Sequence, residues 1–173
     1  MFEGIFRRIF AKFDKNGEPG SYNGNVKQAP SPNFAAGVGR TIDTIVLHNT
    51  AGTLAPSLQR LQDPKAQVSA HYVVDRGGEV YQLVDEKNVA WHAGNRDVNA
   101  RSIGIEIVAH NGALGMTNEQ EKAVVALVRG LVKKYKIKRE NIVPHRKVRA
   151  TACPSLIWKT DAELEAWKAA KEF

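Results

Sequence analysis

The chain reads TIVLHNT over residues 44–50, a run of β-branched and apolar residues that includes a histidine, His48. The β-branched content from Ile42 to Leu47 predicts a buried strand that ends at this histidine. In open α/β sheets, the side chains at the carboxyl end of a strand lie at the edge of the sheet, where they reach a cleft. We therefore expect a functional role for His48.

Strand-like and helix-like segments alternate through the rest of the chain. The patterns predict further strands over residues 70–75, 79–84, 103–108 and 141–143, and a hairpin signal, RGG, joins the first two. They predict helices over residues 56–62 and 117–135, with Thr117 opening a capping box, and a last helix that Asp161 caps and that runs to the C-terminus. This order indicates an α/β fold in which helices flank both faces of a mixed central β-sheet.

The first 40 residues differ from the rest. At helical spacing, residues 1–14 place apolar residues on one face (Phe2, Ile5, Phe6, Ile9, Phe10, Phe13) and basic residues largely on the other (Arg7, Arg8, Lys12). A basic amphipathic helix can lie on an anionic membrane, although the same stripe would serve equally to pack on the domain. Residues 15–40 are rich in Gly, Pro, Ser and Asn, which is typical of a linker or a surface arm. We therefore predict an N-terminal amphipathic arm over residues 1–40 and a globular domain over residues 41–173.

Composition limits the class of protein. A chain of 173 residues forms one domain with a full-sized core. Its net charge of +7 points to a polyanionic partner, such as nucleic acid, an anionic membrane or an anionic cell-wall polymer. The chain has no run of about 18 apolar residues, so it predicts no transmembrane helix. Charged residues interrupt the N-terminal stretch, so we expect no secretory signal and synthesis in the cytoplasm.

Cys153 is the only cysteine, so it cannot form an intrachain disulfide. It lies eight residues after His145, which follows a short apolar strand as His48 does. Two imidazoles and one thiolate suit Zn²⁺, and three protein ligands leave the fourth position for water, as in catalytic zinc sites. The alternative is that each residue is structural, since a lone histidine is often a hydrogen-bonded residue and a lone buried cysteine packs as a small apolar residue.

Glu106 and the WHAG stretch at residues 91–94 are further candidates. A carboxylate within a β-branched strand is costly to bury without a partner, so we expect Glu106 to contact a zinc-bound water or a ligand imidazole. The alternative is a structural carboxylate paired with Arg101 or Arg146. Trp91 and His92 present an indole beside an imidazole, which can stack on a sugar ring and hydrogen-bond it. We assign His92 to substrate or to a contact behind a zinc ligand.

These stretches together resemble a known family. In chain order they are IVLHNT (residues 45–50), VSAHYVVDRGG (68–78), AWHAG (90–94), SIGIE (102–106), PHR (144–146) and ATACP (150–154). The chain is similar to the zinc-dependent N-acetylmuramoyl-L-alanine amidases, the Amidase_2 family that includes the T7 lysozyme type, the AmpD type and the peptidoglycan recognition proteins. The resemblance runs from about residue 41 to 158 and implies the same mixed-sheet fold.

The resemblance also implies roles for individual residues. His48, His145 and Cys153 would bind Zn²⁺, with the cysteine as in T7-like members and in the catalytic recognition proteins. Glu106 would carry the proton-transfer role of the glutamate of AmpD-like members. Thr151 stands where T7-like and AmpD-like members have a lysine, and its hydroxyl would contact the developing oxyanion.

The groove beside the zinc site is expected to bind the substrate. T7-like members carry a tyrosine near the zinc where this chain has Ala70, and Tyr72 lies two residues further along the same strand. We therefore keep Tyr72 as a predicted contact without transferring that tyrosine's role to it. The predicted substrate contacts are Trp91, His92, Asn49, Thr50 and Tyr72.

The function implied is that of a peptidoglycan hydrolase, in which zinc-activated water cleaves the amide between N-acetylmuramic acid and L-alanine. Peptidoglycan would be the partner, with an anionic membrane as a second contact through residues 1–14. We expect a monomeric, bacteriolytic phage-type endolysin that needs no other cofactor and that a holin releases to the cell wall. Two alternatives are a recognition module that binds peptidoglycan without cutting it and, from the charge alone, a nucleic-acid-binding protein. No nucleic-acid motif supports the second.

Overall fold

The strand predicted over residues 42–47 is present, with bounds shifted by two residues, and lies between two parallel neighbours. In the computed structural model, which describes residues 25–173, β3 (Thr44–Asn49) pairs with β7 (Ser102–Ile107) on one side and with β8 (Ile142–Pro144) on the other. The predicted helix over residues 1–14 lies outside the described residues. The three parallel strands end at the same edge of the sheet, so residues far apart in sequence meet there.

On the other side of β7 the sheet continues, within the described residues, with three more strands, and β1 forms its edge. Its order is β1-β5-β4-β7-β3-β8, where β4 (Tyr72–Val74) and β5 (Val80–Gln82) form the predicted antiparallel hairpin. Three short strands were not predicted: two lie in the stretch rich in Gly, Pro, Ser and Asn, and the third has only two residues. They are β1 (Val26–Gln28), which pairs with β5, and the antiparallel pair β2 (Phe34–Ala35) and β6 (Val89–Ala90). The part of the predicted arm that is described thus contributes strands, while the domain boundary near residue 41 stays a prediction.

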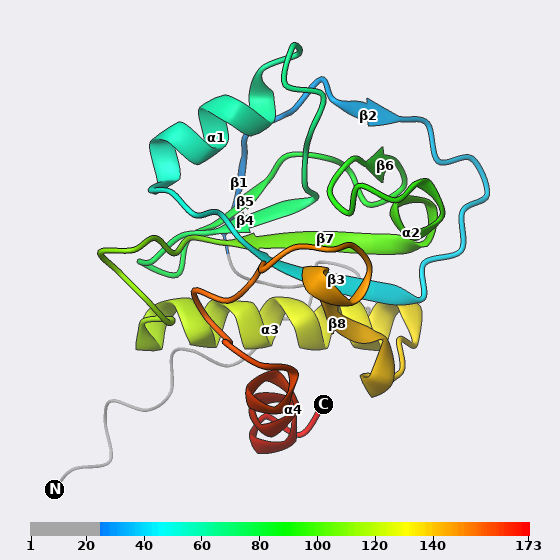
Figure 1. The fold of residues 1–173 in the computed structure, drawn as a ribbon. Helices are drawn as coiled ribbons and strands as arrows, with labels where there is room; N and C mark the ends of the chain where they lie inside the picture. The colour runs from blue at the N-terminus through cyan, green and yellow to red at the C-terminus, as the bar shows by residue number, and fades with distance from the viewer. Residues whose placement is uncertain (1–24) are drawn as a thin grey trace, which may run out of the picture.

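Helices cover both faces of the sheet, which confirms the predicted α/β class (Figure 1). One face carries α3 (Asn118–Tyr135) and α4 (Asp161–Ala170), and the other carries α1 (Leu54–Gln62) and α2 (Arg96–Arg101). Two 3₁₀ turns flank β8, namely η1 (Arg139–Asn141) and η2 (His145–Lys147). None of the helices within residues 25–173 has the length and apolar content to span a bilayer.

The helix caps follow the sequence closely. The Thr117 side chain accepts a hydrogen bond from the Gln120 backbone N–H, as the capping-box pattern predicts. The Thr160 side chain caps α4 in the same way, whereas Asp161, which was predicted as this cap, is the first residue of the helix.

Alternation along the strands separates the core from the site. Ile45 and Leu47 of β3 point into the apolar core beneath α3, together with Ile105 of β7. His48 and its register partner Glu106 therefore point to the opposite face, towards α1. The strand that supports the core on one face thus presents ionisable side chains on the other.

The α3-side core generates a stability prediction. Leu127 is 1% exposed within this core, so Leu127→Ala should lower the free energy of unfolding by about 2–5 kcal/mol. Leu114→Ala is the matched control, since Leu114 is 58% exposed and its truncation should change stability by less than about 0.5 kcal/mol. Urea denaturation followed by circular dichroism measures both. Equal effects of the two substitutions would contradict this description of the core.

Candidate metal centre and cleft

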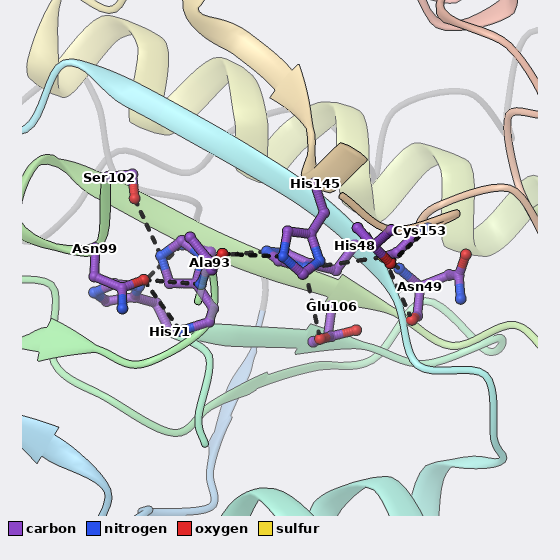
Figure 2. A network of polar contacts seen from close by, with 12 residues as sticks. His48, Asn49, His71, Ala93, Asn99, Ser102, Glu106, His145 and Cys153 are labelled. Atoms are coloured by element: carbon purple, nitrogen blue, oxygen red, sulfur yellow. Dashed lines mark hydrogen bonds and ion pairs between the residues drawn. The ribbon is translucent and has the colours of Figure 1, made fainter. Parts of the chain in front are cut away.

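Three predicted ligands meet where β3 and β8 end. His48 lies at the end of β3, and His145 directly follows Pro144, which pairs with Leu47 across the β3–β8 ladder. Cys153 returns to the same edge on the loop after η2, although it lies 105 residues from His48 in sequence. Figure 2 shows the three side chains side by side, with Glu106 below them.

The geometry of this cluster suits a metal ion. The donor atoms of His48, His145 and Cys153 all lie within 4.8 Å of one another. The two imidazole centroids are 4.4 Å apart, and the Cys153 Sγ lies 4.0 Å from the His48 Nδ1. The backbone N–H of Asn49 donates a hydrogen bond of 3.3 Å to this sulfur. The structure therefore brings the predicted ligands together, as two nitrogen donors and one sulfur donor.

Burial determines the charge states of these groups. It lowers the pKa of His48 well below its usual value, with the neighbouring His145 adding to the effect, and it lowers the pKa of His145 itself. Burial, followed by the charge of Glu106, raises the pKa of the Cys153 thiol to about 12. Both imidazoles are therefore neutral and can each offer a lone pair, whereas the thiol ionises near neutral pH only when a cation compensates its charge.

Glu106 projects into the same space. Its Oε1 lies 3.9 Å from the His48 Nδ1, and its Oε2 is buried without a hydrogen-bond partner among the described residues. Burial raises the pKa of this carboxyl to about 7. A buried carboxyl oxygen with no partner is costly unless it serves a ligand or a reaction.

The structural alternative for Glu106 was an ion pair with Arg101 or Arg146. Arg101 instead pairs with Asp43, and Arg146 donates to Asp161 at 2.7 Å. Each guanidinium group therefore forms its ion pair with another carboxylate, and the carboxyl of Glu106 faces the cluster.

A cleft of about 410 Å³ opens above the cluster. The three predicted ligands and Glu106 line it. Four predicted substrate contacts line it as well, namely Asn49, Thr50, Trp91 and His92. Helix α1 supplies part of the wall. The α1 residues in this wall were not predicted, because no local motif indicates that this short helix lies over the site; they are Pro56, Ser57, Arg60 and Leu61.

His92 lies behind a predicted ligand. It is 8% exposed, and its Nδ1 lies 3.1 Å from the His48 Nε2. Burial, with the neighbouring His48 adding to it, lowers the pKa of His92 well below its usual value, so the ring is neutral. Of the two roles predicted for His92, this contact fits the one behind the ligand.

Two predicted residues lie away from the cleft lining. Tyr72 is buried in the α3-side core, where its hydroxyl donates to Glu86. On β4 the register partner of Glu106 is Val73 and not Tyr72. Alternation along β4 thus turns Tyr72 to the face opposite the site. Thr151 is exposed on the ligand loop, where its hydroxyl accepts a hydrogen bond of 3.3 Å from the Cys153 N–H. Its contact with an oxyanion stays a prediction.

Comparison with known proteins agrees with this geometry. The chain is 36% identical over 98 residues to N-acetylmuramoyl-L-alanine amidase A of Achromobacter lyticus, which covers 56% of this chain and 52% of that protein. Its fold is similar to the catalytic domain of XlyA, with a TM-score of 0.68, 28% identity and coverage of 86% of this chain and 98% of that one. It is also similar to the Escherichia coli amidase AmiD in complex with a substrate, with a TM-score of 0.57, 32% identity and coverage of 62% and 49%.

The chain spans about half the length of the curated relatives it matches. The sequence model of one family, described as N-acetylmuramoyl-L-alanine amidase, matches residues 38–156, a stretch that contains the three predicted ligands, Glu106 and the residues of the cleft. The chain belongs to the Amidase_2 family of N-acetylmuramoyl-L-alanine amidases.

Proposed function

We propose that the chain is a zinc-dependent amidase that hydrolyses the bond between the lactyl group of N-acetylmuramic acid and the L-alanine of the stem peptide. The convergence of two neutral imidazoles, one thiol and one unpaired carboxyl at the cleft carries this proposal. Family membership supports it. The related AmiD structure contains anhydro-N-acetylmuramic acid-L-Ala-D-gamma-Glu-L-Lys, a molecule that includes this bond.

The donor set fits zinc better than other common ions. Nitrogen and sulfur donors suit Zn²⁺, whereas Mg²⁺ and Ca²⁺ prefer oxygen. Only a bound cation would let the buried Cys153 thiol ionise near neutral pH, because burial raises its pKa to about 12. His48, His145 and Cys153 would therefore hold the ion. When bound, zinc would polarise the scissile carbonyl and make water more acidic.

Glu106 is proposed as the proton-transfer group. Its unpaired Oε2 would accept a proton as water adds to the carbonyl carbon, and it would return that proton to the nitrogen as the carbon–nitrogen bond breaks. A carboxyl whose pKa lies at about 7 can hold or release a proton near neutral pH. Thr151 remains the proposed partner of the oxyanion, because it lies two residues before the proposed ligand Cys153.

Substrate binding is proposed for the walls of the cleft. Trp91 is partly exposed there and would offer its indole face to a sugar ring or to the peptide. Arg60 is exposed, and among the described residues that line the cleft it alone carries a permanent positive charge. A carboxylate of the anionic stem peptide would form an ion pair with this arginine. Asn49 and Thr50 would hydrogen-bond the substrate at the end of β3.

We also propose the cellular setting expected from the sequence. The net charge of +7 supports action on the anionic bacterial cell wall as an endolysin. Release by a holin, a monomeric state and membrane contact through residues 1–14 belong to the same proposal.

Zinc content and cleavage test the proposed site together. Wild-type protein should hold about one zinc per chain, and Cys153→Ser should lose both zinc and activity, because one of the three ligands becomes a weaker hydroxyl donor. Elemental analysis measures the metal, and mass spectrometry of muropeptides identifies the bond that is cut. Metal-free wild-type protein that still binds peptidoglycan would instead make the chain a recognition module.

Glu106→Gln separates proton transfer from metal binding. The amide keeps the shape of the side chain but accepts protons poorly, so turnover should fall by about 10²–10⁴-fold while zinc content stays unchanged. Glu140→Gln, at an exposed position in η1, is the matched control and should retain wild-type turnover. Turnover of Glu106→Gln within a few fold of wild type would exclude this role.

The membrane contact is tested by truncation. Deleting residues 1–14 should weaken binding to anionic vesicles, because the basic and aromatic residues of this stretch would be removed. Turnover of a soluble muropeptide should be spared. Vesicle co-sedimentation provides the measurement, and unchanged binding would rule the membrane contact out.

A further inference from the structure

Both histidines of the cluster direct their Nε2 atoms to one short loop, residues 91–94. The His145 Nε2 lies 3.1 Å from the Ala93 carbonyl oxygen (Figure 2). The His48 Nε2 lies 3.1 Å from the His92 Nδ1. A carbonyl oxygen can only accept, so the hydrogen of a neutral His145 must be on Nε2, which leaves its Nδ1 with a free lone pair.

Ser102 sets the direction of the hydrogen bonds at the other histidine. Its hydroxyl donates to the Val98 carbonyl oxygen at 2.6 Å, which uses its single hydrogen. The same oxygen lies 3.1 Å from the His92 Nε2, so it must accept from that atom. A neutral His92 then has a bare Nδ1, which accepts from the His48 Nε2. The His48 Nδ1 is left bare, and it faces Cys153 and Glu106.

Asn99 holds the loop that receives both rings. Its Oδ1 accepts hydrogen bonds from the backbone N–H groups of His92 at 3.2 Å and Ala93 at 2.8 Å. Asn99 is 7% exposed, and like Val98 it belongs to α2. This short helix therefore anchors both hydrogen-bond routes to the cluster.

Gly104 makes room for this arrangement. A Cβ at this position would lie 2.4 Å from the His92 Cγ, so any side chain would displace the ring. The backbone of β7 thus serves as the surface on which His92 rests. The packing leaves the imidazole little freedom to rotate away from His48.

We propose that Ser102 and Asn99 are positioning residues that keep the hydrogens of His48 and His145 on Nε2 and turn both Nδ1 atoms towards the metal. The proposal rests on the proposed function in one respect, namely that the ion is zinc. Neither residue touches the ion. Each acts through the loop 91–94, where a wrong tautomer would place a hydrogen on the nitrogen that must donate its lone pair.

The tautomers can be measured directly in the metal-free, ¹⁵N-labelled full-length chain. Imidazole nitrogen–carbon-proton correlations in NMR spectra should show His48 and His145 as neutral rings with the hydrogen on Nε2. A His48 ring with its hydrogen on Nδ1 would overturn the proposal. This measurement requires neither a variant nor catalytic activity.

Zinc affinity measured by chelator competition gives the second test. Ser102→Ala should weaken zinc binding by about 10-fold and give a mixture of His48 tautomers, because His92 loses its fixed acceptor. Ser31→Ala is the matched control: Ser31 is also a buried serine whose hydroxyl donates to a backbone carbonyl, that of Leu61, and the affinity should stay within about twofold. Thermal unfolding of the metal-free proteins establishes that both variants fold.

Two substitutions of Asn99 test whether its acceptor oxygen supports zinc binding. Asn99→Ala should weaken zinc binding, whereas Asn99→Asp keeps an acceptor for the two N–H groups and should restore most of it. Wild-type affinity in folded Ser102→Ala and Asn99→Ala would overturn the proposal and leave the proposed function intact. Wild-type protein that binds no zinc would refute the proposed function, while the tautomer measurement would still decide the hydrogen-bond arrangement.

Discussion

The site depends on the parallel pairing of β3 with both β7 and β8. In this register His48 lies opposite Glu106, and Pro144 lies opposite Leu47, so that His145 follows at the same edge. A shift of one residue would turn each of these side chains to the other face of the sheet. The apolar residues of the same strands oppose such a shift, because it would take Ile45 and Leu47 out of the core beneath α3. The core beneath α3 therefore fixes the register that the site on the opposite face needs.

Several polar side chains are buried on the cleft side, and some of them need a ligand to compensate their burial. Both nitrogens of the buried His92 ring have hydrogen-bond partners, whereas the His48 ring is hydrogen-bonded at Nε2 and leaves its Nδ1 facing the cluster. Among the described residues one Glu106 oxygen has no partner, and burial raises the pKa of the Cys153 thiol. Such groups destabilise a fold unless an ion or substrate compensates them. The hydrogen bonds from α2 reduce the freedom of the rings before any ion arrives. Folding of the domain thus supplies the free energy that orders these side chains before an ion binds.

Much of the fold was readable from the sequence, but not all of it. Long periodic segments and caps were predicted well, as with the helix that Thr117 begins and the hairpin of β4 and β5. The two-residue strand β6 and the six-residue helix α2 were not predicted, because no longer apolar or periodic run surrounds them as one surrounds β4 and β5. Among the site residues, His48, His145, Cys153 and Glu106 were named in advance and lie together. Tyr72 was expected in the cleft but lies in the core.

The sequence by itself determined which chemical groups the protein offers: two histidines and a glutamate on or after apolar strands, and a single cysteine free of any intrachain disulfide. Residue type and local pattern suffice for this, since strand ends and ligand chemistry are local properties. Only the tertiary structure decided which of these groups meet, which nitrogen of each imidazole faces the cluster and which side of β4 faces the cleft. These depend on strand register and on hydrogen bonds between segments up to about a hundred residues apart, and no local pattern encodes such contacts.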